Sequence, residues 1–189
     1  MKIILVRHGE TIENQKGILA GQTDGKLTKK GIEQAKKLAL TLKNEKIDAI
    51  YSSDLARAVN TAKEIAKYHK EIPLFFVKEL REKDQGSFTG KKINEVDWNN
   101  KPADMETKEM MKKRAKRILE IAYKNYPKGN VIFVGHEGIN RKIIQIIAEE
   151  SKIKLPEKIE FYNASITILE IKKDKNHKIH LLNSVEHLK

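Results

Sequence analysis

Short apolar runs that alternate with amphipathic helical stretches are the feature that most limits how this chain can fold. The candidate strands are the four runs at residues 3–6, 47–51, 74–77 and 131–134. Apolar residues also recur on one face of each of three predicted helices, at residues 32–42, 111–122 and 139–148. The apolar face of the first of these helices begins at Ile32. This alternation predicts a three-layer α/β fold, with a mostly parallel sheet flanked by helices on both faces.

The length of the chain and its lack of a linker predict one domain over residues 1–189. No stretch rich in proline, glycine or serine divides it. A late pair of runs, 165–171 and 179–182, predicts a hairpin at the end of the sheet. Residues 91–104 precede a helix predicted from about 105 to 123 and are left to form a short lid insertion. Trp98 in this insertion could be a core anchor or part of the lid.

Charged side chains follow several of the predicted strands at the point where each strand ends. Arg7 and His8 come directly after the first run, and Arg57 lies in the first turn of the helix after the second. Glu82 follows the third run, and His136 follows the fourth. In open α/β sheets ligands bind outside the carboxyl ends of the strands, so we expect these side chains to share one site.

This combination of side chains is suited to attack on phosphorus. A neutral imidazole is a competent nucleophile, and a guanidinium has the shape to hold phosphate oxygens. Phosphoryl transfer depends mainly on positioning and charge neutralisation, so a metal-free site needs several cationic or N–H donors and an acid. Cationic neighbours disfavour protonation of His8 and so keep it nucleophilic. We therefore expect His8 to be the nucleophile and Glu82 the acid.

The motifs around these residues resemble the histidine phosphatase superfamily, also called the phosphoglycerate mutase-like family, over most of the chain. Residues Arg7 to Glu10 match the Arg-His-Gly-Glu signature of that family. Residues 52–62 resemble the segment with the second phosphate-binding arginine of the family, and residues 80–90 resemble the segment with its proton donor. Residues 135–136 resemble the segment with its second histidine, and residues 163–167 resemble a late strand of its phosphatase branch. The resemblance implies the phosphoglycerate mutase-like fold.

The resemblance also implies a role for each site residue. His8 would become a phosphohistidine, and Glu82 would protonate the leaving alkoxide and then activate water. His136 would complete the catalytic group. The residues that would bind the substrate phosphate are Arg7, Asn14, Arg57 and His136. The resemblance implies no metal ion and no other cofactor.

One position departs from the family pattern. Many members have glycine after the second histidine, whereas this chain has Glu137, whose carboxylate could weaken anion binding. Its backbone N–H could still point inward at the start of a helix while the side chain faces out. Arg141 could be a secondary contact or a charge on the helix surface.

The implied activity is that of a metal-independent phosphomonoester hydrolase, a phosphatase of the histidine acid type. The mutases of the family carry a long insertion after the proton donor, and a lid as short as residues 91–104 leaves a phosphohistidine open to water. A hydrolase is therefore favoured, with a phosphoglycerate mutase as the alternative. The expected partner is a small phosphorylated metabolite, and the sequence leaves its identity and the oligomeric state open.

The net charge of +12 supports a rival function, a non-catalytic basic module that binds nucleic acid. Its densest cluster, residues 112–117, lies on a predicted helix whose other face is apolar, so we expect a solvated helix face. No helix-turn-helix, zinc or aromatic-rich RNA motif accompanies the charge, so nucleic acid is not the expected partner.

The remaining composition points to the cytoplasm. The chain has no cysteine, which excludes disulfides and is compatible with a reducing compartment. The first residues leave no room for a signal peptide, and no apolar run approaches a membrane span, so no membrane contact is expected. We expect His177, His180 and His187 to be polar surface rather than metal ligands.

Overall fold

A single six-stranded sheet runs through the part of the chain that the computed structural model describes, residues 1–157 and 159–189. The strands are β1 (Lys2–Arg7), β2 (Ala49–Ser53), β3 (Leu74–Val77), β4 (Asn130–Gly135), β5 (Ile166–Glu170) and β6 (Lys178–Ser184). Their spatial order is β3-β2-β4-β1-β5-β6. The first four strands in this order pair in parallel, whereas β5 is antiparallel to both β1 and β6. The predicted mostly parallel sheet with a terminal hairpin is confirmed.

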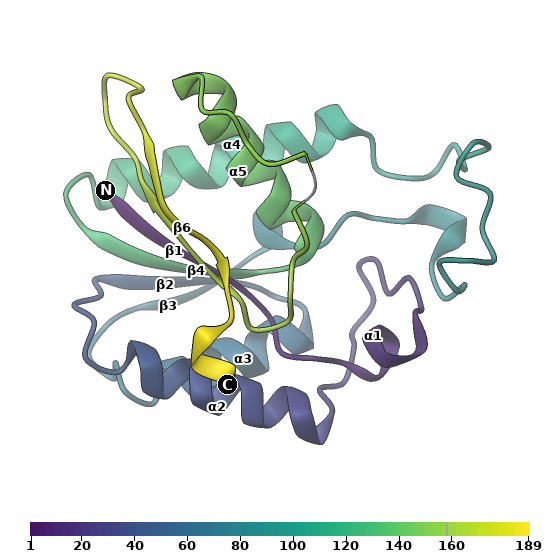
Figure 1. Cartoon of the computed structure of the whole chain (residues 1–189), viewed down its shortest axis with the longest axis horizontal. Helices are drawn as coiled ribbons and strands as arrows, with labels where there is room; N and C mark the ends of the chain where they lie inside the picture. Colours follow the sequence, from purple (N-terminus) through teal and green to yellow (C-terminus); the bar gives the residue numbers. More distant parts are fainter. Residues whose placement is uncertain (158) are drawn as a thin grey trace.

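Helices cover both faces of the sheet, which confirms the three-layer α/β prediction (Figure 1). On one face lie α2 (Lys29–Leu42) and α3 (Ala56–Ala66), and on the other lie α4 (Lys108–Asn125) and α5 (Glu137–Ser151). The side chains of β1 alternate between the two cores, with Ile3 and Leu5 in one and Ile4 and Val6 in the other. The sequence of a strand that is buried on both faces is an unbroken run of apolar residues, as found at residues 3–6.

The observed helices differ from the predicted ones in two details. The third long helix, α4, begins at Lys108 because the Thr107 side chain caps it by accepting a hydrogen bond from the Met110 N–H. In α2, Ile32 is 40% exposed, since the neighbouring Gly31 takes the buried position. A Cβ at Gly31 would lie 2.0 Å from the carbonyl oxygen of Glu10, so only glycine permits this close approach.

The loops at the carboxyl ends of the parallel strands complete the site end of the fold. The short helix α1 (Ile12–Lys16) follows β1, and single turns of 3-10 helix span η1 (Lys78–Leu80), η2 (Gly86–Phe88) and η3 (Glu186–Leu188). Among the described residues, no helix is both long and apolar enough to cross a membrane.

Candidate active site

Three of the predicted site residues meet where β1, β2 and β4 end. The Nε atom of Arg57 donates hydrogen bonds to Nε2 of His8 at 3.3 Å and to Nδ1 of His136 at 3.1 Å. The two imidazole rings lie edge to face with centroids 4.9 Å apart. All three side chains are buried, so the arginine charge acts on both rings with little screening by water.

His8 is held as a neutral ring with one nitrogen available for reaction. Its Nδ1 lies 2.7 Å from the carbonyl oxygen of Gly9, which can only accept, so the ring proton lies on Nδ1. Burial lowers the pKa of His8 well below its usual range, and the charges of Arg57 and Arg7 lower it further. The lone pair of Nε2 therefore stays unprotonated at neutral pH.

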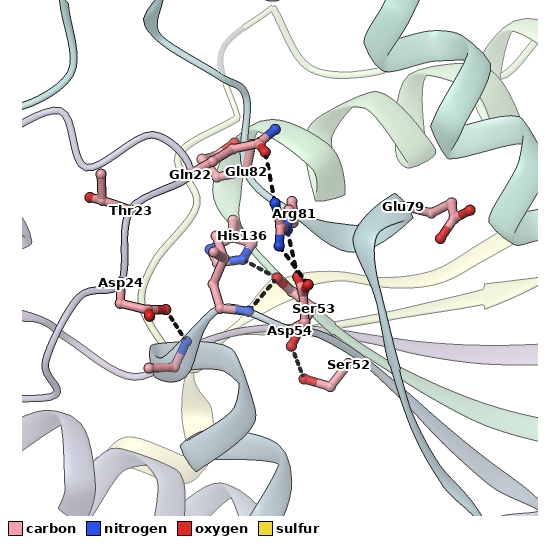
Figure 2. Close-up of polar contacts among 12 residues, drawn as sticks. Gln22, Thr23, Asp24, Ser52, Ser53, Asp54, Glu79, Arg81, Glu82 and His136 are labelled. Atoms are coloured by element: carbon pink, nitrogen blue, oxygen red, sulfur yellow. Dashed lines mark hydrogen bonds and ion pairs between the residues drawn. The ribbon is translucent and has the colours of Figure 1, made fainter.

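Ser53, at the end of β2, orients the second histidine. Its Oγ lies 2.9 Å from Nε2 of His136 and accepts a hydrogen bond from the Leu55 N–H at 3.3 Å (Figure 2). Burial lowers the pKa of His136 well below its usual range, and His8 and Arg57 add to the shift. Ser53 was not predicted as a site residue, although its place at the end of the strand that leads to Arg57 was a usable signal.

Arg7 reaches the site from the last position of β1. Its Nη1 donates to the carbonyl oxygen of Phe161 and lies 3.3 Å from Oε2 of Glu137. Its Nε is buried and has no hydrogen-bond partner among the described residues. Burial lowers the pKa of Arg7, while the nearby carboxylates of Glu137 and Glu82 oppose the shift. The side chain thus has an unused donor for a ligand.

Glu82 lies against the first turn of α5. Its Oε2 accepts a hydrogen bond from the Gly138 N–H at 3.1 Å, and its Oε1 accepts one from the Lys83 N–H at 2.7 Å. Its own carbonyl oxygen accepts from Nε2 of Gln22 at 3.2 Å. The predicted acid is therefore held at both its side chain and its backbone.

Arg114 of α4 clamps the segment that carries Glu82. It donates to the carbonyl oxygens of Glu79, Arg81 and Glu82 and to both carboxylate oxygens of Glu106. Its side chain is 15% exposed, so the prediction that it lies on a solvated basic face was wrong. The exposed basic residues of the helix do follow that prediction, as Arg117 with 71% side-chain exposure illustrates.

A second ion pair steadies the same segment from β2. Asp54 accepts hydrogen bonds from Nε and Nη2 of Arg81, both at 2.6 Å, and Nη1 of Arg81 lies 3.4 Å from Oε1 of Gln22 (Figure 2). This two-pronged pairing of a guanidinium and a carboxylate fixes direction as well as distance. The loop before α2 and the acid segment are thereby joined.

Asn14 is positioned by its own oxygen. The Oδ1 atom accepts from the Thr11 N–H at 3.2 Å and from Nδ2 of Asn163 at 3.0 Å. Nδ2 of Asn163 also donates to the carbonyl oxygen of His8 at 3.2 Å, a contact that the sequence analysis did not assign. These contacts occupy Oδ1 of Asn14 and leave its amide nitrogen as the group able to donate to a bound anion.

Most of the predicted site residues line one cleft of about 370 Å³. The predicted residues on its lining are Arg7, His8, Asn14, Arg57 and Glu82. His136 is fully buried behind Arg57. The outer wall includes Ile93 and Trp98, and the indole N–H of Trp98 donates to the carbonyl oxygen of Ile93 at 3.2 Å. Trp98 therefore belongs to the cleft wall and not to the core.

The guanidinium groups of Arg7 and Arg57 and the amide of Asn14 line the cleft and suit an anion. Within the described ranges, no three histidine, cysteine or acidic side chains form a group that could hold a metal. His177 was predicted to lie on the surface, but its side chain is buried. Its Nδ1 accepts a hydrogen bond from the Lys172 N–H, and its Nε2 lies 3.2 Å from a Glu150 oxygen.

Comparisons with known proteins agree with this geometry. The chain is 31% identical to a protein named metal-independent phosphoserine phosphatase of Arabidopsis thaliana, over 92% of this chain and 78% of that protein. It is 29% identical to a probable phosphatase of Schizosaccharomyces pombe, over 100% of this chain and 95% of the relative. A phosphoserine phosphatase of Entamoeba histolytica, solved in complex with phosphoserine, is 28% identical with a TM-score of 0.84, covering 100% of this chain and 99% of that one.

A family model matches almost all of the strands and helices described above. It is the model of the histidine phosphatase superfamily, branch 1, and it matches residues 3–184. The matched range contains every residue predicted for the site. The chain therefore belongs to the histidine phosphatase superfamily.

Proposed function

We propose that this protein hydrolyses phosphomonoesters without a metal ion, through a covalent phosphohistidine on His8. The observation that carries the proposal is the unprotonated Nε2 of His8, held at the buried end of the cleft beside the guanidinium of Arg57. A phosphoryl group bound there would meet a nucleophile and a fixed positive charge together. Membership of the superfamily supports the same chemistry.

In the first step, Nε2 of His8 attacks phosphorus while the bond from phosphorus to the leaving oxygen breaks. Glu82, in its protonated form, gives its proton to that oxygen, so the alcohol departs neutral. Donors for the three remaining phosphoryl oxygens come from the side chains of Arg7, Asn14 and Arg57. These donors neutralise the charge that develops in the transition state. His136 is fully buried and bonded to Arg57 and Ser53 through its two ring nitrogens, so it acts by positioning Arg57.

In the second step, water attacks the phosphorus of the phosphohistidine. The Glu82 carboxylate accepts a proton from this water, the bond from phosphorus to nitrogen breaks, and the electron pair returns to Nε2 of His8. Phosphate leaves, and Glu82 is again protonated for the next cycle. One acid group thus serves both steps, as microscopic reversibility requires.

We propose a small phosphorylated metabolite as the substrate, because the cleft of about 370 Å³ suits a molecule of that size. The phosphoserine complex of the Entamoeba relative supports this class.

We also propose that the chain forms a single domain spanning residues 1–189, in which residues 91–104 form a short lid. Backbone bonds from Leu19 to Lys91 and from Ile93 to Gly17 support the placement of this lid over the cleft. The cytoplasm is the proposed compartment, since a chain without cysteines does not require an oxidising one.

The test is phosphate release from p-nitrophenyl phosphate in the presence of EDTA, for the wild type and His8→Ala. A matched control is His69→Ala, a histidine that lies outside the cleft with Nε2 near the carbonyl oxygen of Leu42. We expect turnover by the wild type and the control only, with acid-labile phosphate trapped on the wild type after rapid quenching. Turnover by His8→Ala, or a wild type that requires a metal ion, would overturn the proposal.

A further inference from the structure

Glu137 lies inside the cleft and bridges two arginines. Its Oε2 is 3.3 Å from Nη1 of Arg7, and its Oε1 accepts a hydrogen bond from Nη2 of Arg141 at 2.7 Å. The carboxylate lines the same cleft as His8, and 41% of its side chain is exposed. Of the two orientations that the sequence left open for this side chain, the structure has the one that faces the cleft. Arg141 is a contact of Glu137 rather than an isolated surface charge.

Arg7 does not depend on Glu137 alone for its position. The guanidinium is largely buried at the end of β1, and its Nη1 also donates to the carbonyl oxygen of Phe161. Arg141 is likewise held from a second side, since its guanidinium lies 4.9 Å above the centre of the Phe161 ring. Removal of the Glu137 charge would leave both arginines anchored and less neutralised.

The geometry points to Glu137 as an internal competitor for Arg7, one that weakens the hold of the site on inorganic phosphate and so hastens product release. This inference rests on the proposed hydrolysis, in which phosphate is the last product to leave. A phosphate oxygen bound to Nη1 of Arg7 must share that group with the carboxylate or displace it. Both anions carry negative charge at short range in a partly buried cleft, so they repel each other.

The opposite role, in which Glu137 holds Arg7 in place for phosphate, predicts the opposite sign. If the carboxylate were needed to orient Arg7, its neutralisation would weaken phosphate binding. If it competes, neutralisation strengthens binding. The affinity for phosphate therefore separates the two roles without any turnover measurement.

The experiment is calorimetric titration of inorganic phosphate into the wild type and Glu137→Gln, which keeps the shape of the side chain and removes its charge. The matched control is Glu149→Gln, a change of the same charge on the same helix. Glu149 pairs with Lys112 at 2.9 Å on the surface and is not part of the cleft. Thermal unfolding verifies that both variants are folded.

We expect Glu137→Gln to lower the Kd for phosphate by about fivefold to tenfold, the effect of one neutralised charge at short range. The control should change it by less than about twofold, because exposed charges are screened. In the hydrolysis assay, product inhibition by phosphate should strengthen by the same factor. An unchanged or higher Kd for Glu137→Gln would overturn the inference, as would equal effects in both variants.

These outcomes separate this inference from the proposed function. A wild type that binds phosphate but releases none from p-nitrophenyl phosphate would contradict hydrolysis, while tighter binding by Glu137→Gln would still support the competition. A wild type that hydrolyses the ester, with phosphate affinity unaffected by Glu137→Gln, would support hydrolysis and exclude the competition.

Discussion

The carboxylate of Glu82 packs directly against the backbone of Gly138 at the start of α5. Its Oε2 accepts the Gly138 N–H at 3.1 Å, and a Cβ at position 138 would lie only 2.2 Å from Oε1. The glycine therefore gives Glu82 both its hydrogen-bond donor and the space for its side chain. The amino end of the helix also favours a carboxylate at this place.

Gly138→Ala should displace the Glu82 carboxylate and impair proton transfer to the leaving group. We expect kcat/KM for an alkyl phosphate to fall at least about tenfold, since general acid catalysis contributes about 10² to 10⁴. The loss for p-nitrophenyl phosphate should be smaller, because that leaving group needs no proton. Glu82→Gln should show the same contrast between substrates, and equal losses on both would count against Glu82 as the acid.

Stability should decline as the pH falls below 6.5. The folded-state pKa values of His8 and His136 are lowered well below the ordinary value of 6.5, chiefly by burial. Between the lowered pKa and 6.5 the unfolded chain binds protons that the folded chain does not, so the free energy of unfolding rises with pH there. Their contribution is complete above pH 6.5 and decreases below it, by up to about 1.4 kcal/mol per pH unit for each histidine.

Guanidinium unfolding of the wild type at pH 7.5, 6.5 and 5.5 measures this effect. We expect a smaller pH dependence in His8→Gln, because one of the two protonation sites is removed. A wild-type stability that is constant from pH 6.5 to 5.5 would contradict the prediction. The lowered pKa of His8 also predicts that its ring remains unprotonated in mildly acidic buffer.

Arg114→Gln should lower the free energy of unfolding and loosen the segment that carries Glu82. The change leaves Glu106, which is 8% exposed, as a buried carboxylate without its partner, and we expect a loss of about 3 to 5 kcal/mol. Arg117→Gln on the same helix removes an exposed pair with Glu79 and should cost less than about 1 kcal/mol. Denaturant unfolding compares the two variants, and a similar loss in both would contradict a special role for Arg114.

Ser53→Ala should reduce turnover through His136. Because Arg57 donates to Nδ1 of His136, the proton of the neutral ring lies on Nε2 and is donated to Oγ of Ser53. Loss of this buried bond should cost about 1 to 3 kcal/mol and lower kcat by about tenfold. The control is Ser52→Ala, because the Ser52 hydroxyl donates to the neighbouring carbonyl oxygen of Ser53 at 2.9 Å and has no other hydrogen bond among the described residues. Unchanged kcat in Ser53→Ala would exclude the positioning role.

Local sequence patterns located the strands, the helices and the main site residues. Apolar runs and helical periodicity are local properties, so they located the four parallel strands and the long helices within a few residues. His8, Arg57 and His136 follow strand ends in the chain, and parallel pairing brings such ends to one edge of the sheet. That is why their meeting could be predicted without coordinates.

The side chains that hold these residues in place could not be found from local patterns, because they come from elements far apart in the sequence. Arg114 lies in a run of basic residues that looks uniform along the chain, yet its guanidinium turns inward, because α4 packs beside the Glu82 segment. Ser53 reaches His136 across two paired strands, and Glu137 reaches Arg7 across another pair. Such partners are set by the packing of distant elements, and the spacing of residues within one element carries no record of that packing.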